Sequence, residues 1–350
     1  GTLYLTELNS DVKSVKGKPV KIWQGGFKNA HELGGGFGME GSHMYRINGK
    51  YYITCPAGGT GGWQICLRSD NIYGPYEHKL IMNDWSSYPK NGLHQGGMVQ
   101  LKNGDWWFMI MQDRGPIGRV PCLVPVKWID GWPMLGDEGK DLITYPKPAT
   151  GKKSKIKSPA TTDEFNASQL GLQWQWNHNP DNSRWSLKER KGYMRLYASQ
   201  ASTLKDARNT LTQRVQGPSC EGSVEMEVTG LKDGNIAGFG IFEFPYAYVA
   251  IRQESGRRKI VMCNDGKDIE TVEHFNGDKL WIRVRATDKE FKALFYYSLD
   301  GVNYKRIGNE LQMGLGLPWT ANRFALFNFN TTPQGNNGYA DFNWFRFTNK

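Results

Sequence analysis

The sequence predicts an all-β chain, with repeated β-hairpin units in its first part and a β-sandwich in its second. Residues 41–52 and 97–107 share one pattern, in which apolar residues alternate up to Asn-Gly and two aromatic residues open the returning strand. This pattern is typical of a β-hairpin with a tight turn. Met44 and Met98 stand at equivalent positions 54 residues apart, a spacing in the range of a four-stranded propeller blade.

Regularly spaced strands without a helical period predict the rest of this architecture. Residues 1–138 contain two whole repeats and part of a third, whereas a closed propeller needs at least four blades. We therefore expect this part to be the C-terminal portion of a propeller, with a missing N-terminal propeller segment as its partner. Residues 139–160 are polar, with prolines among lysines, which predicts a linker. The short, evenly spaced strands of residues 161–350 predict a jelly-roll-like β-sandwich.

Composition favours a turn-rich carbohydrate-active protein, because the 350 residues include 42 Gly, 16 Pro, 13 Trp and 16 Tyr. A net charge of +10 raises the question of nucleic acid, but the dense basic run is confined to residues 152–157 and is typical of a solvated linker. We expect no nucleic-acid partner. No apolar stretch has the length of a membrane helix, so we also expect no membrane partner. The composition, typical of secreted carbohydrate-active proteins, predicts a periplasmic or extracellular location.

Five cysteines lie far apart, without the C-x-x-C spacing of zinc or redox sites. We expect mostly free, buried thiols, although the sequence leaves a single bridge open. They are Cys55, Cys66, Cys122, Cys220 and Cys263.

Glu40 stands directly before the first repeat, in the tract Glu40-Gly41-Ser42-His43-Met44-Tyr45-Arg46-Ile47-Asn48-Gly49. This tract resembles the general-acid motif of glycoside hydrolase family 43, typically Glu-Gly-Pro-His, an apolar residue, Tyr, Lys and Ile-Asn-Gly. Here Ser42 replaces Pro and Arg46 replaces Lys. The resemblance implies a five-bladed propeller and assigns Glu40 as the general acid, a group that must stay protonated until it protonates the departing glycosidic oxygen.

A second tract, residues 118–133, looks like the last blade of the same family, most like its β-xylosidase and α-L-arabinofuranosidase branches. The resemblance implies that Arg119 binds the terminal sugar, since an Arg fork can donate two hydrogen bonds to neighbouring hydroxyls. His94 resembles the channel histidine that the family places near a central calcium or water cluster, and the adjacent Gln95 serves equally as a substrate-binding candidate.

Aromatic and acidic side chains complete the predicted sites. Trp63, Trp85, Trp106 and Trp107 are candidate platforms for sugar stacking, with one of the last two expected in the core. In the sandwich, which resembles the C-terminal module of two-domain family members, Asp163, Glu164 and Asp341 are candidates for a structural calcium site. Exposed acids at strand ends are an equal alternative. The predicted metal-binding residues are thus His94, Glu164 and Asp341.

The resemblance implies an inverting, exo-acting glycoside hydrolase that releases xylose or arabinose from xylan-derived oligosaccharides. Inversion also needs a second carboxylate to activate water, and nothing before Glu40 matches the family's motif for this Asp. Two alternatives stay open: an α-L-arabinofuranosidase rather than a β-xylosidase, and a non-catalytic carbohydrate-binding fragment.

Overall fold

The computed structural model divides the chain into two compact units, and each is described by itself. The first unit comprises Gly1–Arg114 and Arg119–Ser154, and the second comprises Gly115–Gly118 and Lys155–Lys350. Among the described residues the regular structure consists of strands and two three-residue 3-10 helices, which confirms the predicted all-β class. The structure describes residues 1–24, 39–57, 62–83, 92–140, 144–151, 155, 158–314, 320–333 and 335–349.

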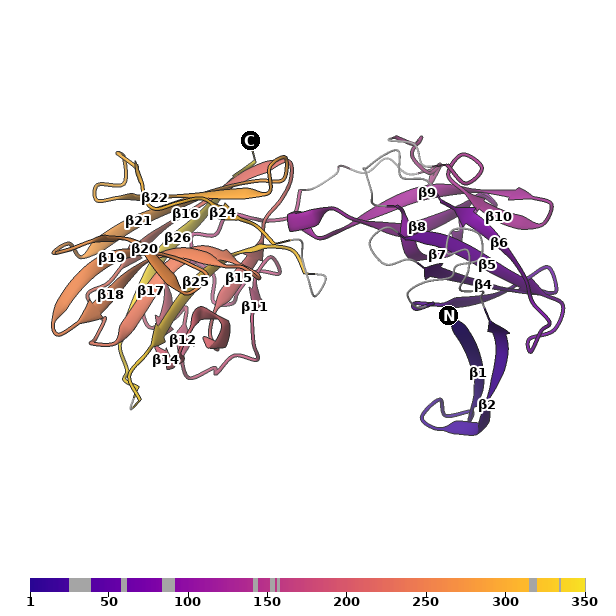
Figure 1. Cartoon of the computed structure of the whole chain (residues 1–350), viewed down its shortest axis with the longest axis horizontal. Coiled ribbons are helices and arrows are strands. Elements are labelled where there is room, and N and C mark those ends of the chain that lie inside the picture. Colours follow the sequence, from indigo (N-terminus) through magenta and orange to yellow (C-terminus); the bar gives the residue numbers. More distant parts are fainter. Residues whose placement is uncertain are drawn as a thin grey trace. The chain divides into compact units, whose positions relative to one another are not determined.

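The first unit contains one two-stranded sheet and two four-stranded antiparallel sheets, which are the predicted propeller blades (Figure 1). The two-stranded sheet joins β1 (Thr2–Leu8) and β2 (Val15–Gln24). The first blade has the order β3-β4-β5-β6 and the second the order β7-β8-β9-β10. Their strands are β3 (His43–Ile47), β4 (Lys50–Ala57), β5 (Trp63–Ser69), β6 (Glu77–Met82), β7 (His94–Gln100), β8 (Trp106–Asp113), β9 (Arg119–Ile129) and β10 (Trp132–Leu135).

The turns of the two blades differ. In the first blade Asn48 and Gly49 have φ angles of +50° and +83°, as a two-residue hairpin turn requires, so the predicted Asn-Gly turn is confirmed there. In the second blade the prediction of an equally tight turn is wrong. The loop runs from Leu101 to Asp105, whose carbonyl accepts a 2.8 Å hydrogen bond from the Leu101 amide. Asp105 follows the Asn-Gly pair and lengthens this loop.

The two blades pack on each other through a shared apolar core. Side chains of the first blade such as Tyr52 and Ile81 join Met98, Phe108 and Val124 of the second in one buried cluster. Hydrogen bonds reinforce this interface at both ends: the Met98 amide donates to the Tyr45 hydroxyl at 2.8 Å, and the Tyr52 hydroxyl donates to the Gly131 carbonyl at 3.1 Å. The geometry of one blade is therefore tied to that of the other.

The second unit is a sandwich of two antiparallel-dominated sheets of eight strands each (Figure 1). One sheet has the order β12-β13-β26-β16-β21-β22-β23, with β24 beside β22; the other has the order β11-β15-β25-β17-β18-β19-β20, with β14 beside β25. Their strands are β11 (Gln175–Trp176), β12 (Trp185–Ser186), β13 (Met194–Tyr197), β14 (Ser199–Gln200), β15 (Leu211–Arg214), β16 (Ser219–Glu227), β17 (Asn235–Phe242), β18 (Ala247–Glu254), β19 (Arg257–Asn264), β20 (Lys267–Val272), β21 (Lys279–Thr287), β22 (Lys292–Ser298), β23 (Lys305–Arg306), β24 (Leu311–Gln312), β25 (Arg323–Asn330) and β26 (Tyr339–Asn349).

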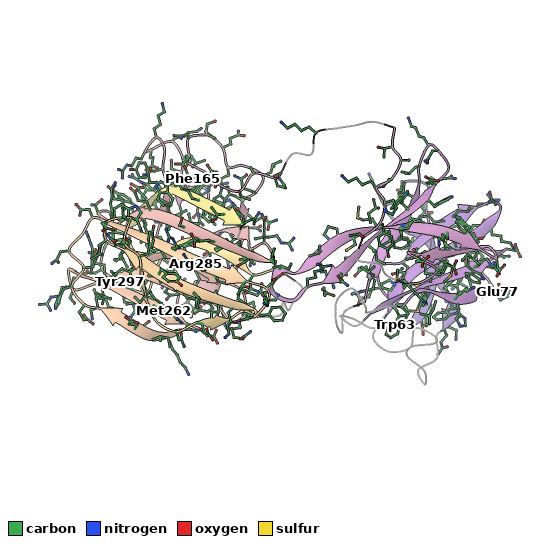
Figure 2. All side chains as sticks on the ribbon, turned by 90° about the horizontal axis from the view of Figure 1, so that it is seen from above. Trp63, Glu77, Phe165, Met262, Arg285 and Tyr297 are labelled. Atoms are coloured by element: carbon green, nitrogen blue, oxygen red, sulfur yellow. The ribbon has the colours of Figure 1, made fainter. Side chains whose placement is uncertain are left out.

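The core of the sandwich is formed by the inward-facing residues of both sheets. Alternation is clear in β21, where Leu280, Ile282 and Val284 are buried between less buried neighbours, as a strand with one face on a core requires. Figure 2 labels Phe165, Met262 and Tyr297, which belong to this buried cluster.

The sequence also predicted mostly free, buried cysteines and no stretch long and apolar enough to cross a membrane. All five cysteines are free, and four of them are buried; burial raises the pKa of Cys55 to about 12, so this thiol stays protonated and unreactive at neutral pH. In the described part of the chain, no helix has the length and apolar character needed to cross a membrane.

Candidate functional site

The chain has the same backbone conformation where it enters each of the two blades, after Glu40 and after His94. Glu40 and His94 stand at equivalent positions, and the residue after each is left-handed: Gly41 has a φ of +56° and Gln95 a φ of +58°. Glycine adopts this conformation freely, whereas a side chain such as that of Gln95 adopts it rarely. The sequence repeat therefore extends to the turn that directs Glu40 and His94.

Gln95 belongs to the second blade and contacts the first blade near these two turns. Its amide nitrogen lies so close to Gly41 that a Cβ built there would come within 2.7 Å of Gln95 Nε2. Its backbone N–H donates a 2.8 Å hydrogen bond to Oε1 of Gln64, which is fully buried on β5. A register shift between His94 and Gly96, where β7 begins, accommodates the extra residue. Gln95 is thus held from both sides, and its side chain covers the turn that carries Glu40.

His94 is 4% exposed, and each of its ring nitrogens lies near an oxygen atom. Nδ1 lies 3.0 Å from the Gly92 carbonyl oxygen, and because a carbonyl only accepts, Nδ1 carries the proton of this contact. Nε2 lies 3.5 Å from Oδ2 of Asp113. Burial lowers the pKa of His94 below its ordinary value, although the Gly92 carbonyl, Asp113 and Glu40 oppose this shift. The imidazole is therefore neutral at neutral pH, and Glu40 is near enough to act on it electrostatically.

Asp113 and Arg119 form an ion pair where β8 ends and β9 begins. They are partners in the β8–β9 register, and Arg119 Nε donates to Asp113 Oδ1 at 3.3 Å. Asp113 is 9% exposed, whereas 34% of the Arg119 side chain is exposed. A largely buried carboxylate thus contacts the base of the guanidinium of a partly exposed arginine.

The predicted tryptophan platforms are placed differently from one another. Trp63 is 4% exposed and belongs to an apolar cluster with Ile53 and Ile65, so its ring offers little surface for stacking on a sugar. Trp107 is buried, whereas Trp106 is partly buried and packs edge-on against Trp128. Trp85 lies outside the described residues.

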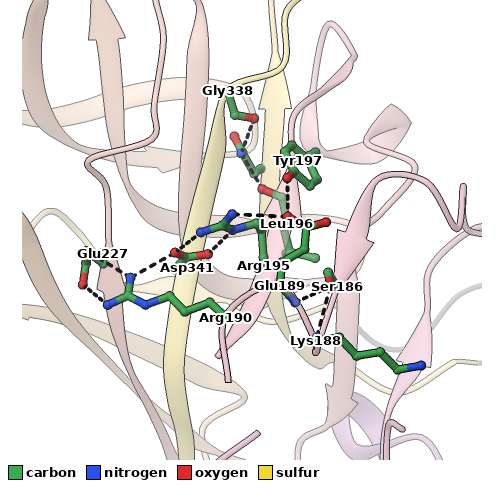
Figure 3. A network of polar contacts seen from close by, with 11 residues as sticks. Ser186, Lys188, Glu189, Arg190, Arg195, Leu196, Tyr197, Glu227, Gly338 and Asp341 are labelled. Carbon is green, nitrogen blue, oxygen red and sulfur yellow. Dashed lines mark hydrogen bonds and ion pairs between the residues drawn. The ribbon is translucent and has the colours of Figure 1, made fainter. Parts of the chain in front are cut away.

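The acids predicted for calcium in the sandwich are engaged by arginines and amides. Asp341, only 2% exposed, accepts hydrogen bonds from Arg195 Nε at 2.8 Å and from Arg190 Nη1 at 3.0 Å (Figure 3). Glu164 pairs with Arg346 at 3.1 Å. Asp163 accepts hydrogen bonds from the Trp174 indole and from the Phe165 amide, both at 2.8 Å.

These partners do not fit a calcium site. Calcium takes six to eight oxygen ligands, but both oxygens of Asp341 already face guanidinium groups, which would repel a cation. His94 and Asp113 together could supply only two metal ligands. In the described part of the chain, no group of three or more His, Cys, Asp or Glu side chains is placed to hold a metal ion. Calcium binding stays a prediction from the sequence.

Three polar residues of this site were not singled out from the sequence: Asp113, Gln64 and Tyr45. The signal for Asp113 was present, because Gln112, Asp113 and Arg114 form a polar end to the apolar strand that begins at Trp106. Gln64 carried no such signal, since its role depends on the amide of Gln95, which lies in the other blade. Tyr45 belongs to the Glu40 motif but acts through the Met98 amide.

Comparison with known families gives two matches that together account for most of the chain. The description "Glycosyl hydrolases family 43" matches residues 1–133, and "Beta xylosidase C-terminal Concanavalin A-like domain" matches residues 162–348.

Curated relatives share this arrangement. A protein of Formosa agariphila named beta-xylosidase is 32% identical over 89% of this chain. A Bacteroides ovatus protein named non-reducing end alpha-L-arabinofuranosidase is 28% identical over 89% of the chain. The chain spans 60% of the first relative's length and 63% of the second's.

Solved structures agree with the fold. A bifunctional GH43-CE protein of Bacteroides eggerthii has a TM-score of 0.87 and 37% identity, covering 99% of this chain and 45% of that one. A GH43 protein of Bacillus licheniformis has a TM-score of 0.83 and 26% identity, covering 98% of this chain and 70% of that one.

Proposed function

Because the chain belongs to glycoside hydrolase family 43 and carries the C-terminal beta-xylosidase domain, we propose that it is part of an inverting, exo-acting glycosidase. This enzyme releases xylose or arabinose from the ends of xylan-derived oligosaccharides, with Glu40 as the general acid. A periplasmic or extracellular location, where such oligosaccharides arise, forms part of the proposal.

The observation that carries the proposal is the placement of Glu40. Glu40 is exposed and directly precedes Gly41, a left-handed glycine that the Gln95 side chain covers. A general acid must be reachable by the glycosidic oxygen that it protonates.

Substrate recognition is proposed for Arg119 together with Gln95. The guanidinium donates to hydroxyls of the terminal sugar, and the Gln95 amide supplies both a donor and an acceptor near Glu40. His94 contributes Nε2 as an acceptor on the buried side of the same site. Trp63 contributes through the packing of the first blade rather than by stacking on the sugar.

No tract of this chain matches the family's motif for the general base. The relatives extend over more residues than the chain covers, and an inverting site needs a second carboxylate 6.5 to 9.5 Å or so from the acid. Without that group the remaining site would bind a sugar but not hydrolyse it. This supports a second candidate function, non-catalytic carbohydrate binding.

Stereochemistry and substrate choice test the proposal together. The protein as encoded by its gene is incubated with nitrophenyl β-D-xyloside and nitrophenyl α-L-arabinofuranoside, and the anomer first released is followed by NMR. We expect turnover with inversion. Release of the retained anomer contradicts the mechanism, preference for the arabinofuranoside selects the arabinofuranosidase alternative, and sugar binding without turnover selects the non-catalytic candidate.

A further inference from the structure

A buried carboxylate lies between two of the residues assigned to sugar binding. Asp113 ends β8, and its two oxygens face different partners: Oδ1 lies 3.3 Å from Arg119 Nε, and Oδ2 lies 3.5 Å from His94 Nε2. Within the described part of the chain Oδ2 accepts no hydrogen bond. A carboxylate this deeply buried needs a cationic partner, because removing an unpaired charge from water is costly.

Arg119 is that partner. Its guanidinium is always charged and lies 3.3 Å from Asp113 Oδ1, whereas His94 directs its other ring nitrogen, Nδ1, to the Gly92 carbonyl. The contact uses Nε, the guanidinium nitrogen nearest the main chain, and therefore fixes the plane of the group at its base. A planar guanidinium held in this way keeps its orientation even though a third of the side chain is exposed.

We propose that Asp113 is a positioning residue of the sugar site, which orients the Arg119 fork toward the terminal sugar. The inference rests on the proposed function, and deepens it by naming what aligns the sugar-binding Arg. Loss of Asp113 removes a contact that fixes the guanidinium, and more of the energy of sugar binding would then be spent on ordering it.

The chain offers a matched control for this ion pair. Arg68 and Glu77 are also register partners on neighbouring strands, β5 and β6, and their side chains pair at 2.7 Å. Glu77 itself is exposed, and Figure 2 labels it at an outer edge of the first unit, away from Trp63. Glu77→Gln therefore removes the same kind of contact without touching the sugar site.

The test uses Asp113→Asn and Glu77→Gln in the protein as encoded by its gene, with nitrophenyl xyloside kinetics and calorimetric binding of free xylose. Loss of uniform binding raises KM with little change in kcat. For Asp113→Asn we expect a KM and a xylose Kd raised on the order of tenfold, with kcat within about threefold. A merely structural role would instead lower kcat through a smaller folded fraction and leave KM unchanged.

Two further variants test whether Asp113 acts through Arg119. Asp113→Glu should recover part of the lost affinity, and Arg119→Lys added to Asp113→Asn should cost less than Arg119→Lys alone, because the two residues act as one unit. Unchanged KM and Kd in Asp113→Asn, or fully additive losses, overturn the inference. If the unaltered protein binds xylose without turnover, only the proposed catalysis fails and the binding series still decides; if it neither binds nor turns over sugar, both proposals fail.

Discussion

Gly41 and Gln95 share a left-handed backbone conformation, and the side chain of Gln95 lies directly against the α-carbon of Gly41. We expect Gly41→Ala to cost at least about 1 kcal/mol of stability through backbone strain. A methyl group there would also displace Gln95 and the Glu40 turn, so kcat/KM should fall roughly tenfold to a hundredfold.

Gly49→Ala is the matched control, because Gly49 also has a positive φ but a Cβ there would meet open space. It should cost similar stability in a denaturant titration and leave kcat/KM unchanged. Equal activity losses in the two variants would contradict a role for the contact between Gly41 and Gln95.

Tyr45→Phe tests the coupling between the blades. The variant removes the acceptor of the Met98 amide, and an unsatisfied, partly buried N–H costs about 1 kcal/mol. The midpoint of urea unfolding should fall accordingly, whereas Tyr4→Phe, on an exposed side chain of β1, should leave it unchanged. An unaltered midpoint in Tyr45→Phe would show that this hydrogen bond adds nothing to the interface.

His94 predicts a pH dependence of stability. Its folded pKa is lowered from the ordinary 6.5, so below that pH the unfolded chain binds more protons than the folded one. The free energy of unfolding therefore decreases as pH falls from about 6.5 toward the lower folded pKa, and the contribution is fully present above 6.5. His94→Asn should flatten this slope in urea titrations at several pH values, and His78→Asn, on an exposed side chain, should not. If the pH dependence of the free energy of unfolding is unchanged in His94→Asn, titratable groups other than His94 cause it.

Asp341→Asn separates an ion-pair role from a metal role. Removing the carboxylate breaks two ion pairs with a buried acid and leaves Arg190 with Glu227 and Arg195 with Glu189, so the expected cost is about 2 to 3 kcal/mol, toward the low end for a buried pair. Glu164→Gln disrupts a largely exposed pair and should cost less than about 1 kcal/mol. Thermal unfolding should not change with a chelator. A melting temperature that drops on chelation in the unaltered protein but not in Asp341→Asn would instead indicate bound calcium.

Local sequence signals predicted most of the fold. The Asn-Gly pair at residue 48 and the alternating apolar residues of β21 act through neighbouring residues, and the 54-residue spacing of Met44 and Met98 reflects the repeat of one blade. The loop that ends at Asp105 was mispredicted because its closing hydrogen bond involves residues outside the Asn-Gly pair.

The site was less predictable, because its geometry depends on residues that meet only after folding. Glu40, His94 and Arg119 were found through motifs, but Asp113 joins the last two through pairing of β8 with β9 and bending of β7. Asp341 was assigned to a metal because acids suit calcium, whereas its arginine partners come from a segment about 150 residues earlier in the sequence.

The measurement that tests the account most directly is the leaving-group dependence of Glu40→Gln in the protein as encoded by its gene. A general acid matters most when the leaving group is a poor one, so turnover of xylobiose should fall by about 10² to 10⁴. Turnover of dinitrophenyl xyloside, whose leaving group needs no proton, should fall far less. Equal losses on both substrates, or no loss on xylobiose, would contradict the assignment of Glu40 as the proton donor.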